Sequence, residues 1–309
     1  MRENILKNLL NLRNKLLIKN FFNLIELIMC NLCRLLNYEN KIFSNFQVFS
    51  NGKLISRLRI EKSKKLNFEN DKTLNELNLK SFSYLGRIEI NDVNQAKRYF
   101  FNQEKIYNSH IPNLKKNNQI LMKDFLVRND SNYGSFDIQT SLKCPNLENI
   151  SKDFKFKEIS EKYLNSKKIK IYSINTMLTK KTKNLHDVTK LHRDFDSSNS
   201  LVFFIYWTKV DKNNGATSLI PGSHLYDHNK NFHKNFSDTH KLEYLEGVEG
   251  SIFCLDTWAY HRGNPNIINP RLVTWIRFTA VPAKTYYIDE NYIFKNDLKN
   301  FNSKIQLVF

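Results

Sequence analysis

Glycine, proline and cysteine are scarce in this sequence, with 8, 6 and 4 residues among 309. Lysine, asparagine and isoleucine instead recur along the whole chain, a bias that an AT-rich gene would also produce. The 48 Lys and Arg residues outnumber the 30 Asp and Glu residues and leave a net charge of +18. This charge favours anionic partners such as nucleic acid, acidic lipid or a phosphorylated substrate. Because the bias runs through the entire chain, we take it only as an indication of an anionic substrate.

The four cysteines are too few and too irregularly spaced for a disulfide framework. We therefore expect a reducing compartment, the cytoplasm. Cys30 and Cys33 form a C-x-x-C pair, but no second pair exists to complete a tetrahedral metal site. We interpret them as two small buried residues of an apolar helix.

No hydrophobic run is long enough to suggest a membrane span. The longest candidate, residues 21–36, is interrupted by polar residues and is shorter than the ~18–20 apolar residues that a span needs. A signal-peptide pattern is also missing. Residues 1–45 have apolar residues at helical spacing, and residues 1–65 contain 13 Lys or Arg against 4 Glu. We predict a helical accessory segment over residues 1–45, packed on the remaining domain (46–309) or lying on an anionic membrane surface.

The composition of the remaining chain is that of a folded protein, with 41% hydrophobic and 13% aromatic residues. We predict helices over residues 92–104 and 149–164, and loops over 115–119 and 129–134. From residue 167 onward, short β-type runs follow one another over residues 168–176, 201–207 and 271–279, separated by turns at 213–215 and 221–222. Closely spaced short strands indicate a β-sandwich or barrel.

A candidate metal site begins at His192 and Asp194. On an extended strand these two residues point to the same face, so an imidazole and a carboxylate enter one cavity. His261 follows a later apolar run and is the candidate third ligand. Two histidines and one carboxylate leave one face of a metal open, as in non-haem Fe(II) enzymes. His224 competes as a ligand, although the Pro-Gly-Ser turn before it favours a local role. The other histidines lie in polar segments without a partner at metal spacing: His110, His186, His228, His233 and His240.

The surrounding motifs resemble those of the phytanoyl-CoA dioxygenase family. Residues 214–224 contain an N-G and a P-G-S-H element, and residues 250–264 end in a distal histidine followed by an asparagine. Ser251 stands where the family usually has aspartate. The resemblance covers residues 168–282, which we take as the core, and it implies a mainly β fold with flanking helices, a double-stranded β-helix (jelly-roll, cupin-like). It also implies Fe(II), 2-oxoglutarate and O₂, with His192, Asp194 and His261 as metal ligands.

An arginine after the distal histidine binds 2-oxoglutarate in the resembled family. Arg271 has the matching spacing, and the planar guanidinium can form two charge-assisted hydrogen bonds to a carboxylate. Arg277 lies on the same face of the predicted strand and is the second candidate; its alternative role is a salt bridge. Thr217 and Trp207 are candidate cofactor-lining residues, with Tyr206 and Trp275, although aromatic residues at such positions commonly belong to the core.

The resemblance implies an oxygenase that converts 2-oxoglutarate to succinate and CO₂ while hydroxylating an unactivated C–H bond. Related halogenases carry a small residue at the position of Asp194, so the retained carboxylate favours hydroxylation. The expected substrate is a small molecule or an acyl or lipid-like compound. Two alternatives stay open: a metal-free binding protein on the same barrel, and a membrane-surface protein. No nucleic-acid-binding module is visible, and no pattern speaks to the oligomeric state.

Overall fold

The computed structural model describes residues 68, 70–109, 118–128, 132–167, 169–181, 191–194, 200–225, 241–266 and 268–280. The predicted accessory segment, with Cys30 and Cys33, lies outside these residues. So do the five histidines assigned to polar segments. Within the described part of the chain, no helix combines the length and apolar character that a bilayer crossing requires.

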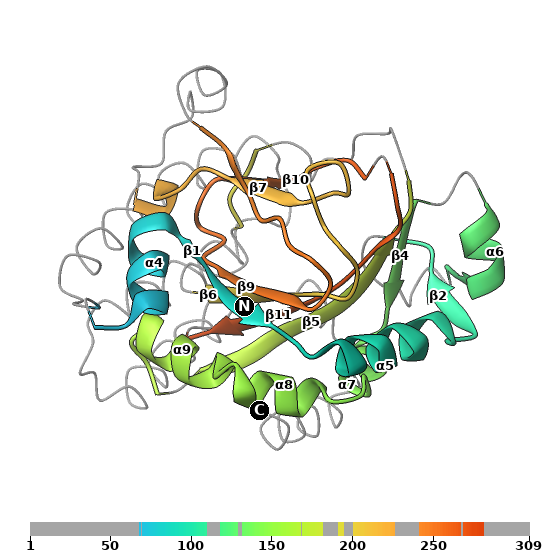
Figure 1. The fold of residues 1–309 in the computed structure, drawn as a ribbon, viewed down its shortest axis with the longest axis horizontal. Helices are drawn as coiled ribbons and strands as arrows, with labels where there is room; N and C mark the ends of the chain where they lie inside the picture. Colours follow the sequence, from blue (N-terminus) through green and yellow to red (C-terminus); the bar gives the residue numbers. More distant parts are fainter. Residues whose placement is uncertain are drawn as a thin grey trace, which may run out of the picture.

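Two antiparallel sheets form a flattened barrel (Figure 1). The larger sheet has the strand order β1-β9-β6-β11-β5-β4-β2-β3, and the smaller has the order β10-β7-β8. The larger sheet comprises β1 (Phe82–Arg87), β2 (Lys105–Tyr107), β3 (Gln119–Leu121), β4 (Tyr133–Phe136), β5 (Lys170–Thr179), β6 (Ser200–Tyr206), β9 (Ser251–Leu255) and β11 (Arg271–Thr279). The smaller comprises β7 (Thr217–Leu219), β8 (Glu243–Tyr244) and β10 (His261–Gly263). The predicted mainly β, double-stranded β-helix fold is confirmed.

Strand β11 shows why the sequence produces two separate cores. It is paired on both sides, with β5 and with β6. Its alternate side chains therefore enter different layers. Leu272 and Ile276 belong to a core between the large sheet and the helices. Val273 and Trp275 belong to a second core between the two sheets. Arg271 and Arg277 are on the same alternation as Val273, so both arginines face the space between the sheets.

Helices cover the outer face of the large sheet (Figure 1). They are α4 (Lys72–Lys80), α5 (Ile90–Phe101), α7 (Ile138–Leu142), α8 (Leu147–Asp153) and α9 (Phe156–Tyr163), while α6 (Met122–Val127) lies beside the short strands β2 and β3. Asp71 caps α4 by accepting a hydrogen bond from the Leu74 amide at 3.2 Å. Asp137 caps α7 through the Thr140 amide at 2.7 Å.

Three predicted segments have other bounds in the structure, and one of them is the loop expected over residues 115–119, because β3 begins at Gln119. The helix expected over residues 149–164 is two helices, because Lys155 between α8 and α9 has a left-handed backbone with φ of 54°. The loop expected over residues 129–134 ends earlier, since β4 begins at Tyr133. The helix expected over 92–104 is present as α5, and all three predicted β runs are strands.

Candidate active site

His192, Asp194 and His261 meet between the two sheets. Their candidate ligand atoms all lie within 4.8 Å of one another, the arrangement predicted from the sequence. His261 begins β10, and His192 exchanges two backbone hydrogen bonds of 2.9 Å with it. Asp194 is held by its amide, which donates to the Thr257 carbonyl at 3.1 Å. Backbone pairing therefore brings the three side chains together even though they are far apart in sequence.

The geometry of the cluster is suited to a metal ion. Oδ1 of Asp194 lies 3.6 Å from Nε2 of His192 and 3.7 Å from Nε2 of His261. Nδ1 of His261 is 3.0 Å from the Ala259 carbonyl oxygen. A proton on Nδ1 donates to that carbonyl and leaves the Nε2 lone pair directed at the cluster.

The electrostatics also favour the ligand forms of these groups. Burial lowers the pKa of His261 to about 4, so its imidazole is neutral at physiological pH. Burial by itself would raise the pKa of Asp194. The positive charge of Arg277 is the largest of the effects that outweigh burial, and it keeps the pKa of Asp194 below its usual range. A neutral imidazole and an ionised carboxylate are the forms that bind metals.

The P-G-S-H element supports the ligands without joining them. The Ser223 hydroxyl donates to the Ile220 carbonyl at 2.7 Å and accepts from the Tyr260 amide at 2.8 Å. The backbone carbonyl of Ser223 accepts a hydrogen bond from the Arg193 guanidinium at 2.6 Å. The Arg193 guanidinium also lies 4.2 Å from the Tyr260 ring centre. Ser223 thus links the segment carrying His192 and Asp194 to the segment entering His261. The sequence analysis did not single out Arg193. Its orientation was predictable, because the residue between two ligands on an extended segment points to the face opposite theirs.

His224, the competing ligand in the sequence analysis, is buried in a short 3₁₀ helix (Ser223–Leu225). Among the residues that the structure describes, it is not part of the candidate metal cluster.

Arg271 is buried at the start of β11, near the phenols of Tyr206 and Tyr133. Its Nε has no hydrogen-bond partner among the described residues. Leaving a buried donor unpaired is unfavourable, so this atom fits a carboxylate ligand better than it fits a closed protein core. Gly215 makes room for the side chain, because a Cβ there would lie 3.3 Å from Arg271 Cδ. The glycine also has φ of +77°, a backbone conformation that other residues rarely adopt.

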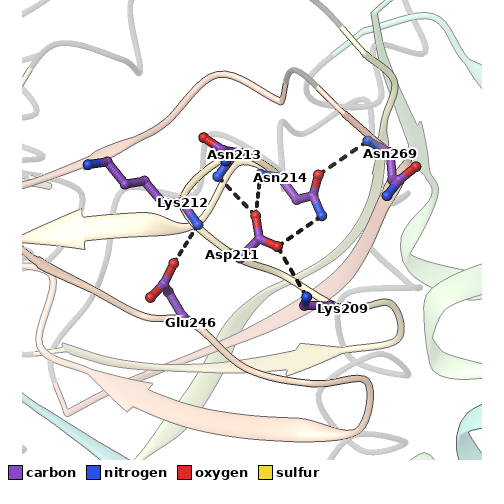
Figure 2. A network of polar contacts seen from close by, with 7 residues as sticks. All are labelled: Lys209, Asp211, Lys212, Asn213, Asn214, Glu246 and Asn269. Carbon is purple, nitrogen blue, oxygen red and sulfur yellow. Dashed lines mark hydrogen bonds and ion pairs between the residues drawn. The ribbon is translucent and has the colours of Figure 1, made fainter.

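A polar network holds the N-G turn against the segment that leads into β11 (Figure 2). The Asp211 carboxylate accepts from the amides of Asn213 and Asn214 at 2.9 and 3.1 Å. The side-chain oxygen of Asn214 then accepts from the Asn269 amide at 3.2 Å. The N-G motif therefore positions Arg271 from two sides, through Gly215 and through the chain before β11.

Arg277, the second candidate for 2-oxoglutarate, is engaged elsewhere. Its Nη1 lies 3.1 Å from Oδ2 of Asp194, and both side chains are only 14% exposed. The structure therefore places Arg277 in the salt bridge that the sequence analysis gave as its alternative role.

The two candidate lining residues differ in position. Thr217 lies two residues from Leu219, which is directly opposite His261, so Thr217 shares the face of the small sheet that carries this ligand. Trp207 is not brought to the site. Its ring belongs to the core behind the large sheet, 6.4 Å from the Phe100 ring, and its indole nitrogen donates to Thr274 at 2.8 Å.

A double-stranded β-helix with two histidines, one carboxylate and a buried arginine between its sheets defines a class of enzymes. This class is the non-haem iron, 2-oxoglutarate-dependent oxygenases, whose cofactor is Fe(II) and whose co-substrates are 2-oxoglutarate and O₂. The family profile of phytanoyl-CoA dioxygenase (PhyH) matches residues 94–267, more than half of the chain. The chain belongs to this family.

Several solved structures are similar to the protein. EctD from S. alaskensis, solved with 2-oxoglutarate and 5-hydroxyectoine, has 14% identity and a TM-score of 0.49, covering 68% of this chain and 76% of its own. The α-ketoglutarate-dependent epimerase SnoN of nogalamycin biosynthesis has 13% identity and a TM-score of 0.48, covering 68% and 80%. The carbocyclase SnoK of the same biosynthesis has 13% identity and a TM-score of 0.47, covering 70% and 85%. No curated protein matches the sequence.

Proposed function

We propose that the protein is a hydroxylase that inserts oxygen into an unactivated C–H bond of a small-molecule, acyl or lipid-like substrate. The observation that carries the proposal is the intact His192, Asp194 and His261 cluster, with a carboxylate as its third donor. A carboxylate occupies the position that a halide ligand would need, so oxygen transfer is favoured over halogenation. An iron(II) ion held by these residues would supply the O₂-dependent oxidation of the C–H bond, with 2-oxoglutarate as co-substrate and succinate and CO₂ as co-products.

The residues of the chain have separate tasks in this reaction. Nε2 of each histidine and Oδ1 of Asp194 are the atoms that would hold the iron. Arg271 would bind the far carboxylate of 2-oxoglutarate through the guanidinium edge that includes its unpartnered Nε. Val273 and Trp275, on the same face of β11, exclude water from the space between the sheets.

The net charge of +18 supports an anionic substrate. The two buried, unbridged cysteines among the described residues, Cys144 and Cys254, are consistent with the cytoplasmic location that we propose. Membrane contact through residues 1–45 is a separate proposal, and co-sedimentation with anionic liposomes at low and high salt tests it.

The test of the proposed reaction is succinate formation with Fe(II), 2-oxoglutarate and O₂ against a panel of carboxylated, acyl and phosphorylated compounds. The wild-type protein should form succinate and a product heavier by one oxygen atom. His192→Ala and Asp194→Ala should abolish both products while circular dichroism stays unchanged. Lys162→Gln, on the exposed side of α9, is the control. Turnover that survives either ligand substitution contradicts the proposal, and a metal-free binding protein would show no Fe(II) uptake at all.

A further inference from the structure

The two oxygens of Asp194 have different environments. Oδ1 faces the two imidazole nitrogens at 3.6 and 3.7 Å. Oδ2 faces Nη1 of Arg277 at 3.1 Å. Arg277 comes from β11 in the large sheet, whereas the two histidines are joined by backbone pairing beside the small sheet. The carboxylate thus lies between a cation on one side and the candidate metal position on the other.

Strand β5 is irregular opposite Arg277. The pairing of β11 with β5 shifts register between Arg277 and Phe278, so that Ser173 lies opposite Arg277 and Ile171 lies opposite Phe278. The extra residue lies in β5, whereas β11 keeps a regular register with β6 through Arg277, so Arg277 stays on the alternation that it shares with Arg271 and Val273. Arg277 is also 14% exposed, whereas long charged side chains are mostly solvated unless they are paired. The salt bridge therefore lies inside the barrel and is not a surface ion pair.

The number of oxygens that the carboxylate gives to a metal matters for this class of enzyme. A carboxylate can bind a metal with one oxygen or with two. Two histidine nitrogens and one carboxylate oxygen would leave positions of the ion open for a 2-oxo acid and O₂. A second carboxylate oxygen would occupy one of these positions. A cation that retains Oδ2 prevents the rotation that would bring it to the metal.

We propose that Arg277 is a positioning residue that restricts Asp194 to one-oxygen metal binding and so keeps a coordination position open. This inference rests on the proposed function. It gives the two arginines on one face of β11 different tasks: Arg271 binds the co-substrate, and Arg277 orients a metal ligand. The contact is an ion pair, because Oδ2 has no geometrically formed hydrogen bond among the described residues, so it is the charge of Arg277 that retains Oδ2.

The test uses the full chain loaded anaerobically with Co(II), whose visible absorption weakens as its coordination number rises. In Arg277→Met the absorption should be weaker than in the wild type, because Oδ2 is free to bind as an additional ligand. Loading with Fe(II) and saturating 2-oxoglutarate gives a second reading, the visible charge-transfer band of the chelated 2-oxo acid. Its saturating amplitude in Arg277→Met should fall roughly twofold or more. Arg277→Lys keeps the charge, so its band amplitude should lie between those of the wild type and Arg277→Met.

Two controls separate this proposal from the proposed function. Arg262→Met removes an equal charge one residue after His261, and Arg262 instead lies 3.4 Å from the Ser218 hydroxyl, so its spectra should match the wild type. His192→Ala should remove the Co(II) spectrum altogether. If the wild type shows no such spectrum, the proposed function fails and this inference fails with it. If the wild type and His192→Ala behave as expected but Arg277→Met has the wild-type absorption and band amplitude, only the positioning role is overturned.

Discussion

At the scale of single residues, two arginines have different tasks in the site, Arg271 in co-substrate binding and Arg277 in orienting a metal ligand. Arg271→Met should raise the 2-oxoglutarate concentration needed for half-maximal binding by about 10- to 100-fold, since a hydrogen-bonded charge contributes roughly 1.5–3 kcal/mol. Metal binding should be unchanged, because the ion pairs of Asp194 among the described residues are with His192, His261 and Arg277 and not with Arg271. Calorimetric titration of each variant with Co(II) and then with 2-oxoglutarate measures both quantities. Equal losses of both affinities would contradict the division.

Trp207 is a buried residue outside the site, and its substitution should affect stability without affecting co-substrate binding. Trp207→Phe removes the hydrogen bond from the indole nitrogen to Thr274 and leaves space in a fully buried position. Urea unfolding should show a loss of about 1–3 kcal/mol in the free energy of unfolding. Affinity for 2-oxoglutarate should stay at the wild-type value. A clear loss of that affinity would indicate that Trp207 contributes to the co-substrate site.

The residue patterns also show how far sequence reasoning reaches. An H-x-D on an extended segment predicted that His192 and Asp194 share one face, and the ordered motifs that resemble the family added His261 to them. Tyr206 and Trp207 were both offered as lining residues, but neighbours on a strand point to opposite faces, so only one of them can face the site. Tyr206 does so, beside Arg271. The partner of Arg277 depended on a contact between segments that are distant in sequence, which a local pattern does not contain.

At the scale of elements, turns hold the functional side chains in place. Gly215→Ala should weaken 2-oxoglutarate binding, because the added Cβ requires a strained backbone and crowds the Arg271 side chain. Titration with Co(II) should remain normal in this variant. Gly222→Ala is a useful comparison, since Gly222 has a similar φ of +71° but a Cβ there would meet the Leu79 carbonyl and not Arg271. Equal effects of both substitutions on 2-oxoglutarate affinity would indicate general strain instead.

The elements themselves were unevenly predictable. Long β-branched and aromatic runs marked β5, β6 and β11, and β11 has the predicted bounds, Arg271–Thr279. The short strands β1, β2 and β3 were missed. Strand β1 is at the edge of the sheet, and its stability comes from pairing with β9, a contact remote in sequence. The break between α8 and α9 was also missed, because Lys155 carries no glycine-like signal for its left-handed backbone.

At the scale of the whole molecule, metal binding and folding should be linked. The three ligands come from segments that only the assembled barrel brings together, so the folded state binds the metal and the unfolded chain does not bind it with comparable strength. Co(II) at about 100 times its dissociation constant should raise the free energy of unfolding by roughly 2.7 kcal/mol. Thermal unfolding with and without Co(II) measures this. His192→Ala should show no such increase, and an equal increase in that variant would place the metal elsewhere.

The most direct test of the central claim is a crystal structure of the protein grown anaerobically with Fe(II) and 2-oxoglutarate, with iron located by anomalous scattering. The account predicts a single iron peak bounded by His192, Asp194 and His261, with the far carboxylate of the 2-oxo acid against Arg271. An iron peak away from these side chains, or a 2-oxo acid bound against a different cation, would contradict it.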